Sequence, residues 1–183
     1  SQPLFRLSIL EPSFGAGDFL IPIVERLLIS CKELLWSHED PVQLLASSIR
    51  AFELHQATFQ ETRNRIIDLL IANEISEQAA RELCSRWLFQ GDFLLHDWEM
   101  QFDMVAGNPP YVRQELIPAP LLSEYRRRFK TMYDRADLYI AFIERSLSLL
   151  NQKGKLGFIC ADRWMKNRYG GPLRQMVAEN FHL

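Results

Sequence analysis

The sequence has little cysteine, with 3 cysteines among 183 residues, at Cys31, Cys84 and Cys160. They are odd in number, lie far apart and form no CxxC pair, so a disulfide framework and a zinc site are both poor interpretations. We therefore expect reduced thiols in the core of a cytoplasmic protein, and no bound metal. The chain also lacks a basic stretch followed by an apolar one, which is the pattern of a secretory signal at the N-terminus.

Long apolar runs are also missing. The longest candidate, Phe19–Cys31, contains Pro22, Glu25 and Arg26. A helix that crosses a bilayer needs about 20 mostly apolar residues, so this stretch is too short and too charged. We expect no membrane partner.

Net charge is small as well, at −2, which disfavours a uniformly basic nucleic-acid binder. The total conceals a split, because residues 1–100 carry a net −7 and residues 101–183 a net +5. Such a division suggests one face suited to an anionic partner. With 48% apolar and 24% charged residues, the chain has the balance of one ordinary folded domain.

Apolar runs alternate with segments of helical periodicity along most of the chain. Strands are predicted at Leu7–Leu10, Ser48–Leu54, Trp87–Gln90, Phe102–Ala106 and Lys155–Cys160, and helices at Phe19–Lys32, Thr58–Ala72, Ser76 to about Arg86, Leu121–Met132, Ala136–Asn151 and Pro172–Glu179. Pro118–Pro120 reads as a flexible linker. This alternation predicts an α/β fold with a doubly wound, mainly parallel sheet, whose ligands bind at the carboxyl edge of the strands.

A small-residue turn, EPSFGAGDFL, follows the first predicted strand. Gly15 and Gly17 allow the backbone to approach a ligand closely, but Leu20 stands where a dinucleotide fingerprint has its third glycine. The acid Glu11 disfavours a phosphate and favours a cationic group. An ordinary strand-to-helix turn is the alternative interpretation.

Acidic residues end the next two predicted strands. Glu53 can accept hydrogen bonds from both hydroxyls of a ribose, although a surface glutamate is equally consistent with the pattern. Asp92 can accept a hydrogen bond from an adenine amino group while Phe93 packs on the ring, but Asp92 could equally be a helix cap.

The strongest motif is Asn108-Pro109-Pro110-Tyr111, directly after the fourth predicted strand. Two consecutive prolines stop the strand and form a rigid loop. The Asn108 side chain and the Pro109 carbonyl can both accept hydrogens from a planar amino group, which would free the lone pair of that nitrogen for attack. Tyr111 can stack on a base that has left the duplex.

The ordered set EPSFGAGDFL, FEL, GDFL and FDMVAGNPPYV resembles the N6-adenine DNA methyltransferases that depend on S-adenosylmethionine. RADLYIAFIERSLSLL and KLGFICADRWMKNRYGGPLRQMV are similar to the large restriction–modification and phage-defence enzymes of that family. The resemblance implies a Rossmann-like methyltransferase fold, S-adenosyl-L-methionine as cofactor and double-stranded DNA as partner. An endonuclease, fused or associated, is a further partner that the resemblance implies.

The resemblance also implies residue roles. The turn with Glu11, Pro12, Ser13, Gly15 and Gly17 holds the methionine end of the cofactor, Glu53 the ribose, and Asp92 and Phe93 the adenine. Asn108, Pro109, Pro110 and Tyr111 bind the target adenine. Asp137 and Tyr139 begin the helix beside the cofactor pocket. Tyr169 or Trp164 forms a wall of the target pocket, and the alternative is that the tryptophan is a core residue.

Basic residues cluster in two segments. Arg126, Arg127 and Arg128 form a run, with Arg113 before it and Arg135 after it, and a second group contains Arg163, Lys166, Arg168 and Arg174. We expect Arg113, Arg126–Arg128, Arg163 and Lys166 to contact DNA phosphates, which position DNA without reading its sequence. Solvated helix faces are the alternative interpretation.

We expect the chain to be a partial catalytic domain over residues 1–183, truncated at both ends and lacking a target-recognition domain. Two alternatives to DNA methylation remain. An NPPY methyltransferase can instead act on a protein glutamine or an RNA base, because the side-chain amide poses the same problem of a weak nucleophile. A non-catalytic module that binds cofactor or DNA is the other.

Overall fold

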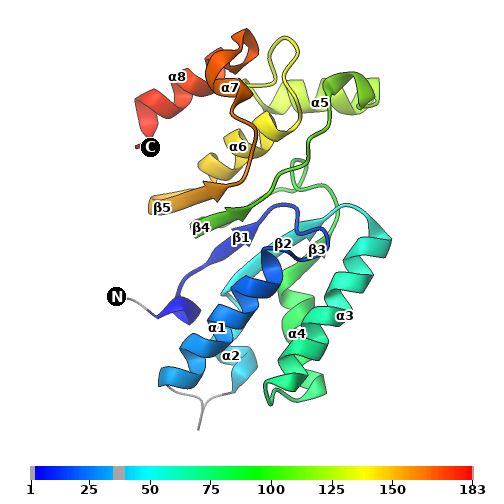
Figure 1. Cartoon of the computed structure of the whole chain (residues 1–183), viewed down its shortest axis with the longest axis vertical. Helices are drawn as coiled ribbons and strands as arrows, with labels where there is room; N and C mark the ends of the chain where they lie inside the picture. The colour runs from blue at the N-terminus through cyan, green and yellow to red at the C-terminus, as the bar shows by residue number, and fades with distance from the viewer. Residues whose placement is uncertain (1–2, 35–39, 183) are drawn as a thin grey trace.

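The computed structural model describes residues 3–34 and 40–182, and within these ranges five strands form one parallel sheet. The strand order is β3-β2-β1-β4-β5 (Figure 1). Ser1 and Leu183, the two ends of the chain, lie outside the described residues. The predicted fold class, a doubly wound parallel α/β sheet, is confirmed.

Helices separate consecutive strands except between the third and the fourth, where residues 91–101 form no helix. In chain order the elements are η1 (Leu4–Arg6), β1 (Ile9–Glu11), α1 (Leu20–Leu34), α2 (Pro41–Leu45), β2 (Ile49–Glu53), α3 (Gln56–Ala72), α4 (Glu77–Trp87), β3 (Leu88–Gln90), β4 (Phe102–Gly107), η2 (Gln114–Leu116), α5 (Ala119–Arg128), α6 (Tyr139–Ser148), β5 (Leu150–Phe158), α7 (Arg163–Lys166), η3 (Arg168–Gly170) and α8 (Gly171–Asn180).

Two apolar clusters cover the two faces of the sheet. Because side chains alternate along a strand, Ile49 and Ala51 of β2 pack with α1 to α4, whereas Phe52 packs with α5 to α8. Figure 1 shows these two groups of helices on opposite sides of the sheet. Cys31 and Cys84 are buried in the first cluster, as expected for core thiols. Burial raises the pKa of Cys31 to about 11 and that of Cys84 to about 12.

Helix starts agree with their sequence signals. The Ser76 hydroxyl accepts a hydrogen bond from the Ala79 amide at 3.3 Å, which caps α4 as predicted.

Pro118–Pro120 was wrongly predicted as a flexible linker. Pro118 is the N-cap of α5 and Pro120 lies in its first turn, where a proline costs little because the first amides of a helix have no intrahelical partner.

The fifth strand is longer than predicted and begins before Gly154 rather than after it. A side chain at Gly154 would place its Cβ 2.8 Å from the Phe102 carbonyl oxygen, so glycine is required by the close approach of β4 and not by a turn. The short helices α2 and α7 were not predicted, because five and four residues are too few to display a helical period. None of the described helices is both long and apolar enough to span a membrane.

Candidate active site at the carboxyl edge of the sheet

The carboxyl ends of β1 and β4 lie side by side, although the two strands are far apart in the sequence. Leu10 pairs with Val105, and β2 lies on the other side of β1. The order in which strands are added to the sheet therefore reverses between β1 and β4. Open α/β sheets bind ligands at such a switch point. The predicted site residues that follow β1, β2, β3 and β4 all lie along this edge.

The loop after β1 is held in an unusual backbone conformation. Gly15 and Gly17 have φ angles of +50° and +88°, which L-residues with a side chain rarely adopt. A Cβ at Gly17 would also lie 3.0 Å from the Thr62 side chain. The Thr62 hydroxyl of α3 donates a hydrogen bond to the Gly15 carbonyl at 2.7 Å, so this helix holds the loop in place.

Glu53, at the end of β2, is tied to this loop. Its Oε2 accepts a hydrogen bond from the Gly15 amide at 3.0 Å, and its Oε1 accepts one from the His55 amide at 2.7 Å. The side chain is 7% exposed. Each carboxylate oxygen keeps a second acceptor site, so the residue can still receive two hydroxyl donors.

Glu11, the last residue of β1, is an acid with an unsatisfied buried oxygen. It is 1% exposed, and its Oε2 has no hydrogen-bond partner among the described residues. Burial raises its pKa to about 8, and the nearby charge of Asp18 acts in the same direction. A buried acceptor of this kind fits a cationic group such as the ammonium of a methionine moiety.

Asp92 follows β3, and both of its oxygens have partners. Oδ1 accepts a hydrogen bond from the Leu94 amide at 2.8 Å, and Oδ2 accepts one from the Tyr125 hydroxyl at 2.5 Å. Phe93 is 2% exposed and packs against Phe52 at 6.0 Å between ring centroids. The structure therefore places the Phe93 ring in the core, with almost no surface free for a cofactor ring.

The loop after β4 presents two free acceptors. Asn108 is exposed, and neither its side chain nor the Pro109 carbonyl accepts a hydrogen bond within the described residues. The Ser13 hydroxyl donates to the Asn108 backbone carbonyl at 3.1 Å and so joins this loop to the loop after β1. Tyr111 is 54% exposed, and its hydroxyl donates to the Ile159 carbonyl at 3.1 Å.

An aromatic chain leads from this loop to the residues after β5. The Tyr111 and Tyr139 ring centroids are 5.9 Å apart, and the Tyr139 hydroxyl lies 3.3 Å from that of Tyr169. Tyr169 is 9% exposed and Trp164 6%, so both lie largely within the core on this side of the sheet. Asp137, predicted to begin a helix, precedes α6, which starts at Tyr139.

The predicted basic residues divide into two structural groups. Those of α5 are engaged within the protein, because Arg127 and Arg128 pair with Glu124, and Arg126 donates to Gln114 at 2.7 Å. Lys166 likewise pairs with Asp162, at 2.8 Å. The ion pairs of Arg127, Arg128 and Lys166 could have been predicted from the sequence. Glu124 lies three and four residues before the two arginines, and Asp162 lies four residues before the lysine, which are the helical spacings that allow ion pairs.

The predicted phosphate contacts Arg113 and Arg163, together with Tyr169, line a cavity of about 450 Å³. It is lined by Arg113, Glu115, Leu116, Arg135, Asp137, Arg163, Asn167 and Tyr169. Of these residues, Glu115, Leu116 and Asn167 had not been singled out from the sequence. Only the fold brings the segments before α6 and after β5 next to the one after β4.

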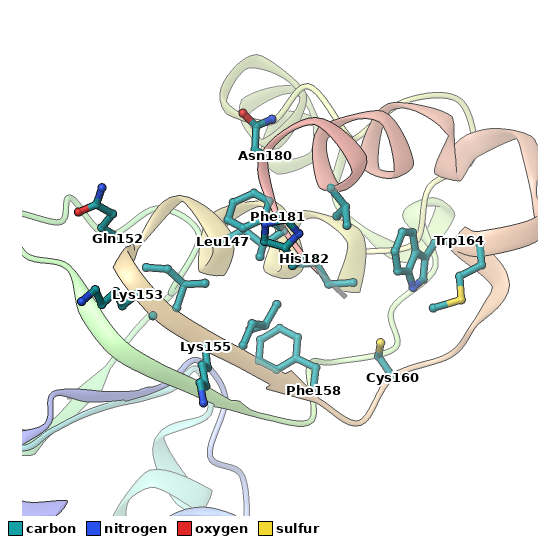
Figure 2. Close-up of a pocket in the computed structure, with 16 residues that line it drawn as sticks. Leu147, Gln152, Lys153, Lys155, Phe158, Cys160, Trp164, Asn180, Phe181 and His182 are labelled. Carbon is teal, nitrogen blue, oxygen red and sulfur yellow. The ribbon is translucent and has the colours of Figure 1, made fainter. Parts of the chain in front are cut away.

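A second, larger hollow lies away from this edge, between β5 and α8 (Figure 2). It has a volume of about 640 Å³ and an apolar lining that includes Leu147, Phe158 and Phe181. Of the residues assigned to cofactor or target from the sequence, it is lined only by Trp164, the alternative to Tyr169 as a wall of the target pocket. It is therefore separate from the candidate active site.

Solved structures confirm the fold class. The chain superposes with a TM-score of 0.65 at 17% identity on a nuclease-deletion mutant of the Type ISP restriction-modification enzyme LlaGI, covering 100% of this chain and 20% of that one. With the M protein of the Type I restriction enzyme EcoKI the TM-score is 0.60 at 15% identity, over 96% and 35% of the two chains. The fold is the Rossmann-like one of the S-adenosylmethionine-dependent methyltransferases.

Sequence comparison identifies the family to which the chain belongs. Residues 23–183 match the family described as Eco57I restriction-modification methylase, and the chain belongs to this family. It is 60% identical to the Type II methyltransferase M.PaeR7I of Pseudomonas aeruginosa and 50% identical to M.XhoI of Xanthomonas vasicola, over 100% of this chain in both cases. The chain spans 32% and 33% of the length of these relatives.

Proposed function

We propose that this chain is the catalytic part of a site-specific DNA methyltransferase, which transfers a methyl group from S-adenosyl-L-methionine to N6 of an adenine flipped out of double-stranded DNA. The observation that carries the proposal is the Asn108–Tyr111 loop, whose two free acceptors lie at the switch point beside the buried carboxylates of β1 and β2. The family to which the chain belongs supports the restriction–modification setting.

The residues at the edge fit the proposed cofactor. Glu11 offers a buried, unpartnered oxygen to an ammonium group, and Glu53 offers acceptor sites to two ribose hydroxyls. Asp92 retains acceptor capacity for an adenine amino group because each carboxylate oxygen can take two hydrogen bonds. Phe93 is too buried for the ring-packing role in this conformation, so the proposal does not include it.

Catalysis would depend mainly on positioning. When bound, S-adenosylmethionine supplies an electrophilic methyl group on a positively charged sulfonium. The Asn108 side-chain oxygen and the Pro109 carbonyl would each accept one hydrogen of the target amino group. Two fixed acceptors would draw that nitrogen out of conjugation with the ring, so that its lone pair points toward the methyl carbon.

Rigidity of the loop is part of this mechanism. Pro109 is buried, Ser13 holds the Asn108 carbonyl, and Tyr111 is anchored through its hydroxyl. The exposed Tyr111 ring is then available to stack on the extruded base. In the transfer the N–CH₃ bond would form as the S–CH₃ bond breaks, and the nitrogen would then release one proton to solvent.

A methyl-acceptor assay with the full-length protein tests this function. We expect radioactive methyl groups from S-adenosylmethionine to appear in duplex DNA, and N6-methyladenine to appear at one sequence when that DNA is sequenced with a method that detects the modified base. Label found in protein or RNA, with none in DNA, would instead support the alternative that the loop binds a glutamine amide or an RNA base.

A further inference from the structure

Three arginines from separate segments surround the 450 Å³ cavity next to the Asn108–Tyr111 loop. Arg113 follows β4, Arg135 precedes α6, and Arg163 begins α7. The Leu138 amide donates to the Val112 carbonyl at 2.9 Å, which fixes the segment before α6 against the one after the loop. In Figure 1 the chain rises from the end of β4 toward α5 and from the end of β5 toward α7, both in the upper part of the view.

These arginines have no committed partner. Within residues 3–34 and 40–182, none of the three makes a side-chain hydrogen bond or an ion pair, whereas the arginines of α5 and Arg174 are all engaged. An unpaired guanidinium retains its five donors, which match two oxygens of a phosphate or carboxylate at once. A solvated helix face does not explain three unpaired arginines gathered from three segments around one hollow.

Two acids also line the cavity and do not cancel its charge. Glu115 and Asp137 balance two of the three arginines, so one positive charge remains. Burial raises the pKa of Asp137, while the positive charges of Arg163 and Arg113 lower it. Asp137 therefore interacts electrostatically with both guanidinium groups, although within the described residues it forms an ion pair with neither.

The cavity is also close to the proposed target pocket. Tyr169 forms part of its wall and contacts the Tyr139 hydroxyl, and the Tyr139 ring lies 5.9 Å from that of Tyr111. A flipped nucleotide stacked on Tyr111 stays joined to a phosphate on each side, so the strand must continue past this wall.

We propose that Arg113, Arg135 and Arg163 bind a phosphodiester group of the DNA strand beside the extruded nucleotide. The inference rests on the proposed function, because it takes the ligand of the Asn108–Tyr111 loop to be a nucleotide in DNA. The contact fixes the position of the strand and reads no base, so it is common to all DNA sequences that the protein binds.

The test compares full-length wild-type protein with Arg135→Gln, with Arg163→Gln and with the double variant. Arg26→Gln is the matched control, because Arg26 is an exposed arginine of α1 that also makes no side-chain hydrogen bond within the described part of the chain. Binding to a duplex is measured over a range of salt concentrations. Cofactor affinity by calorimetry and the thermal midpoint report whether the fold and the neighbouring site are intact.

Loss of one phosphate contact lowers the slope of log K against log salt by about 0.9. We expect the double variant to lose at least this much slope and roughly tenfold in DNA affinity at low salt. Cofactor affinity and thermal midpoint should remain unchanged, and Arg26→Gln should match the wild type. Unchanged slopes in a wild-type protein that methylates DNA would overturn the phosphate site and leave the proposed function standing.

Two further outcomes separate the inferences. In the first, the wild type binds DNA in a salt-dependent way but transfers no label to it, and the double variant loses this binding. That result would support the phosphate site and contradict only the methylation. Inorganic phosphate tests for a free anion as the ligand. Phosphate could raise the thermal midpoint of the wild type and leave that of the variants unchanged. If the wild type and the variants also bound DNA equally, the assignment of the site to DNA would be overturned.

Discussion

The Tyr125 hydroxyl of α5 donates a 2.5 Å hydrogen bond to Oδ2 of Asp92, the residue proposed to receive the adenine of the cofactor. Tyr125 is 3% exposed, and burial and Asp92 both raise the pKa of its hydroxyl, so it remains a donor at neutral pH. The helix that carries the basic run therefore also positions a carboxylate of the candidate cofactor site.

Replacement Tyr125→Phe removes this hydrogen bond and keeps the ring. We expect the free energy of unfolding to fall by about 1 kcal/mol, which is typical of a lost intramolecular hydrogen bond. Cofactor affinity should fall roughly fivefold, because Asp92 would be held only by the Leu94 amide. Calorimetry and thermal melts measure the two effects, and an unchanged affinity in a destabilised variant would show that Tyr125 acts on the fold alone.

The pH dependence of stability should report the burial of Glu11. Its pKa is raised from 4.5 to about 8 by burial and by Asp18, so the folded state holds a proton that the unfolded chain has already lost. Stability should therefore fall as pH rises from about 5 to 8 and level off above that range. In Glu11→Gln, an uncharged isostere, the fall of the thermal midpoint over this range should be clearly smaller.

The same residue should couple cofactor binding to proton release. If Glu11 receives the ammonium group, binding favours its ionised form, so at pH 7 the protein should release close to one proton as S-adenosylmethionine binds. Calorimetry in two buffers of different ionisation enthalpy measures this number. Equal heats in both buffers would contradict the placement of Glu11 beside a cationic group.

Sequence patterns predicted the elements of the fold better than the contacts between them. The first four strands were predicted because each is a short apolar run followed by a turn or an acid, as in Phe102–Gly107, whereas only the second half of the fifth was predicted, since its first half is polar. The hydrogen bond between Tyr125 and Asp92 was not, because it joins residues 33 apart through the way in which α5 packs. Phe93 was misplaced for the same reason, since an aromatic after a strand can face a ligand or the core.

The basic run shows what local spacing can reveal. Arg127 and Arg128 follow Glu124 at the helical intervals that allow ion pairs, and hydrogen bonds from both lower the Glu124 pKa to about 2. Their availability for phosphate is therefore reduced in a way that the sequence already indicated. The convergence of Arg113 with Arg163 had no such local signal.

This difference predicts unequal effects on DNA binding. Arg127→Gln removes a guanidinium that must first release Glu124, whereas Arg163→Gln removes one with no ion pair among the described residues. We expect the first variant to lower duplex affinity clearly less than the second, at the same salt concentration. Equal losses, measured by fluorescence anisotropy with one labelled duplex, would indicate that α5 contacts DNA as directly as the cavity does.

The most direct test of the proposed chemistry is at Asn108. Asn108→Ala removes the side-chain acceptor that would orient the target amino group, and the side chain makes no other hydrogen bond in the described residues. We expect methyl transfer to DNA to fall at least about a hundredfold, as when a positioned polar group is removed from an active site. S-adenosylmethionine affinity should stay within about twofold of the wild type, since none of the carboxylates at the edge is altered.

A second variant separates orientation from simple loop damage. Asn108→Asp keeps an oxygen that can accept a hydrogen bond, so it should retain more methyl transfer than Asn108→Ala under single-turnover conditions with saturating cofactor. The Ser13 hydrogen bond goes to the Asn108 backbone and is available in both variants, so the loop should keep its anchor and both proteins should melt near the wild-type temperature. Full activity in the alanine variant would remove the amine-orienting role assigned to this loop.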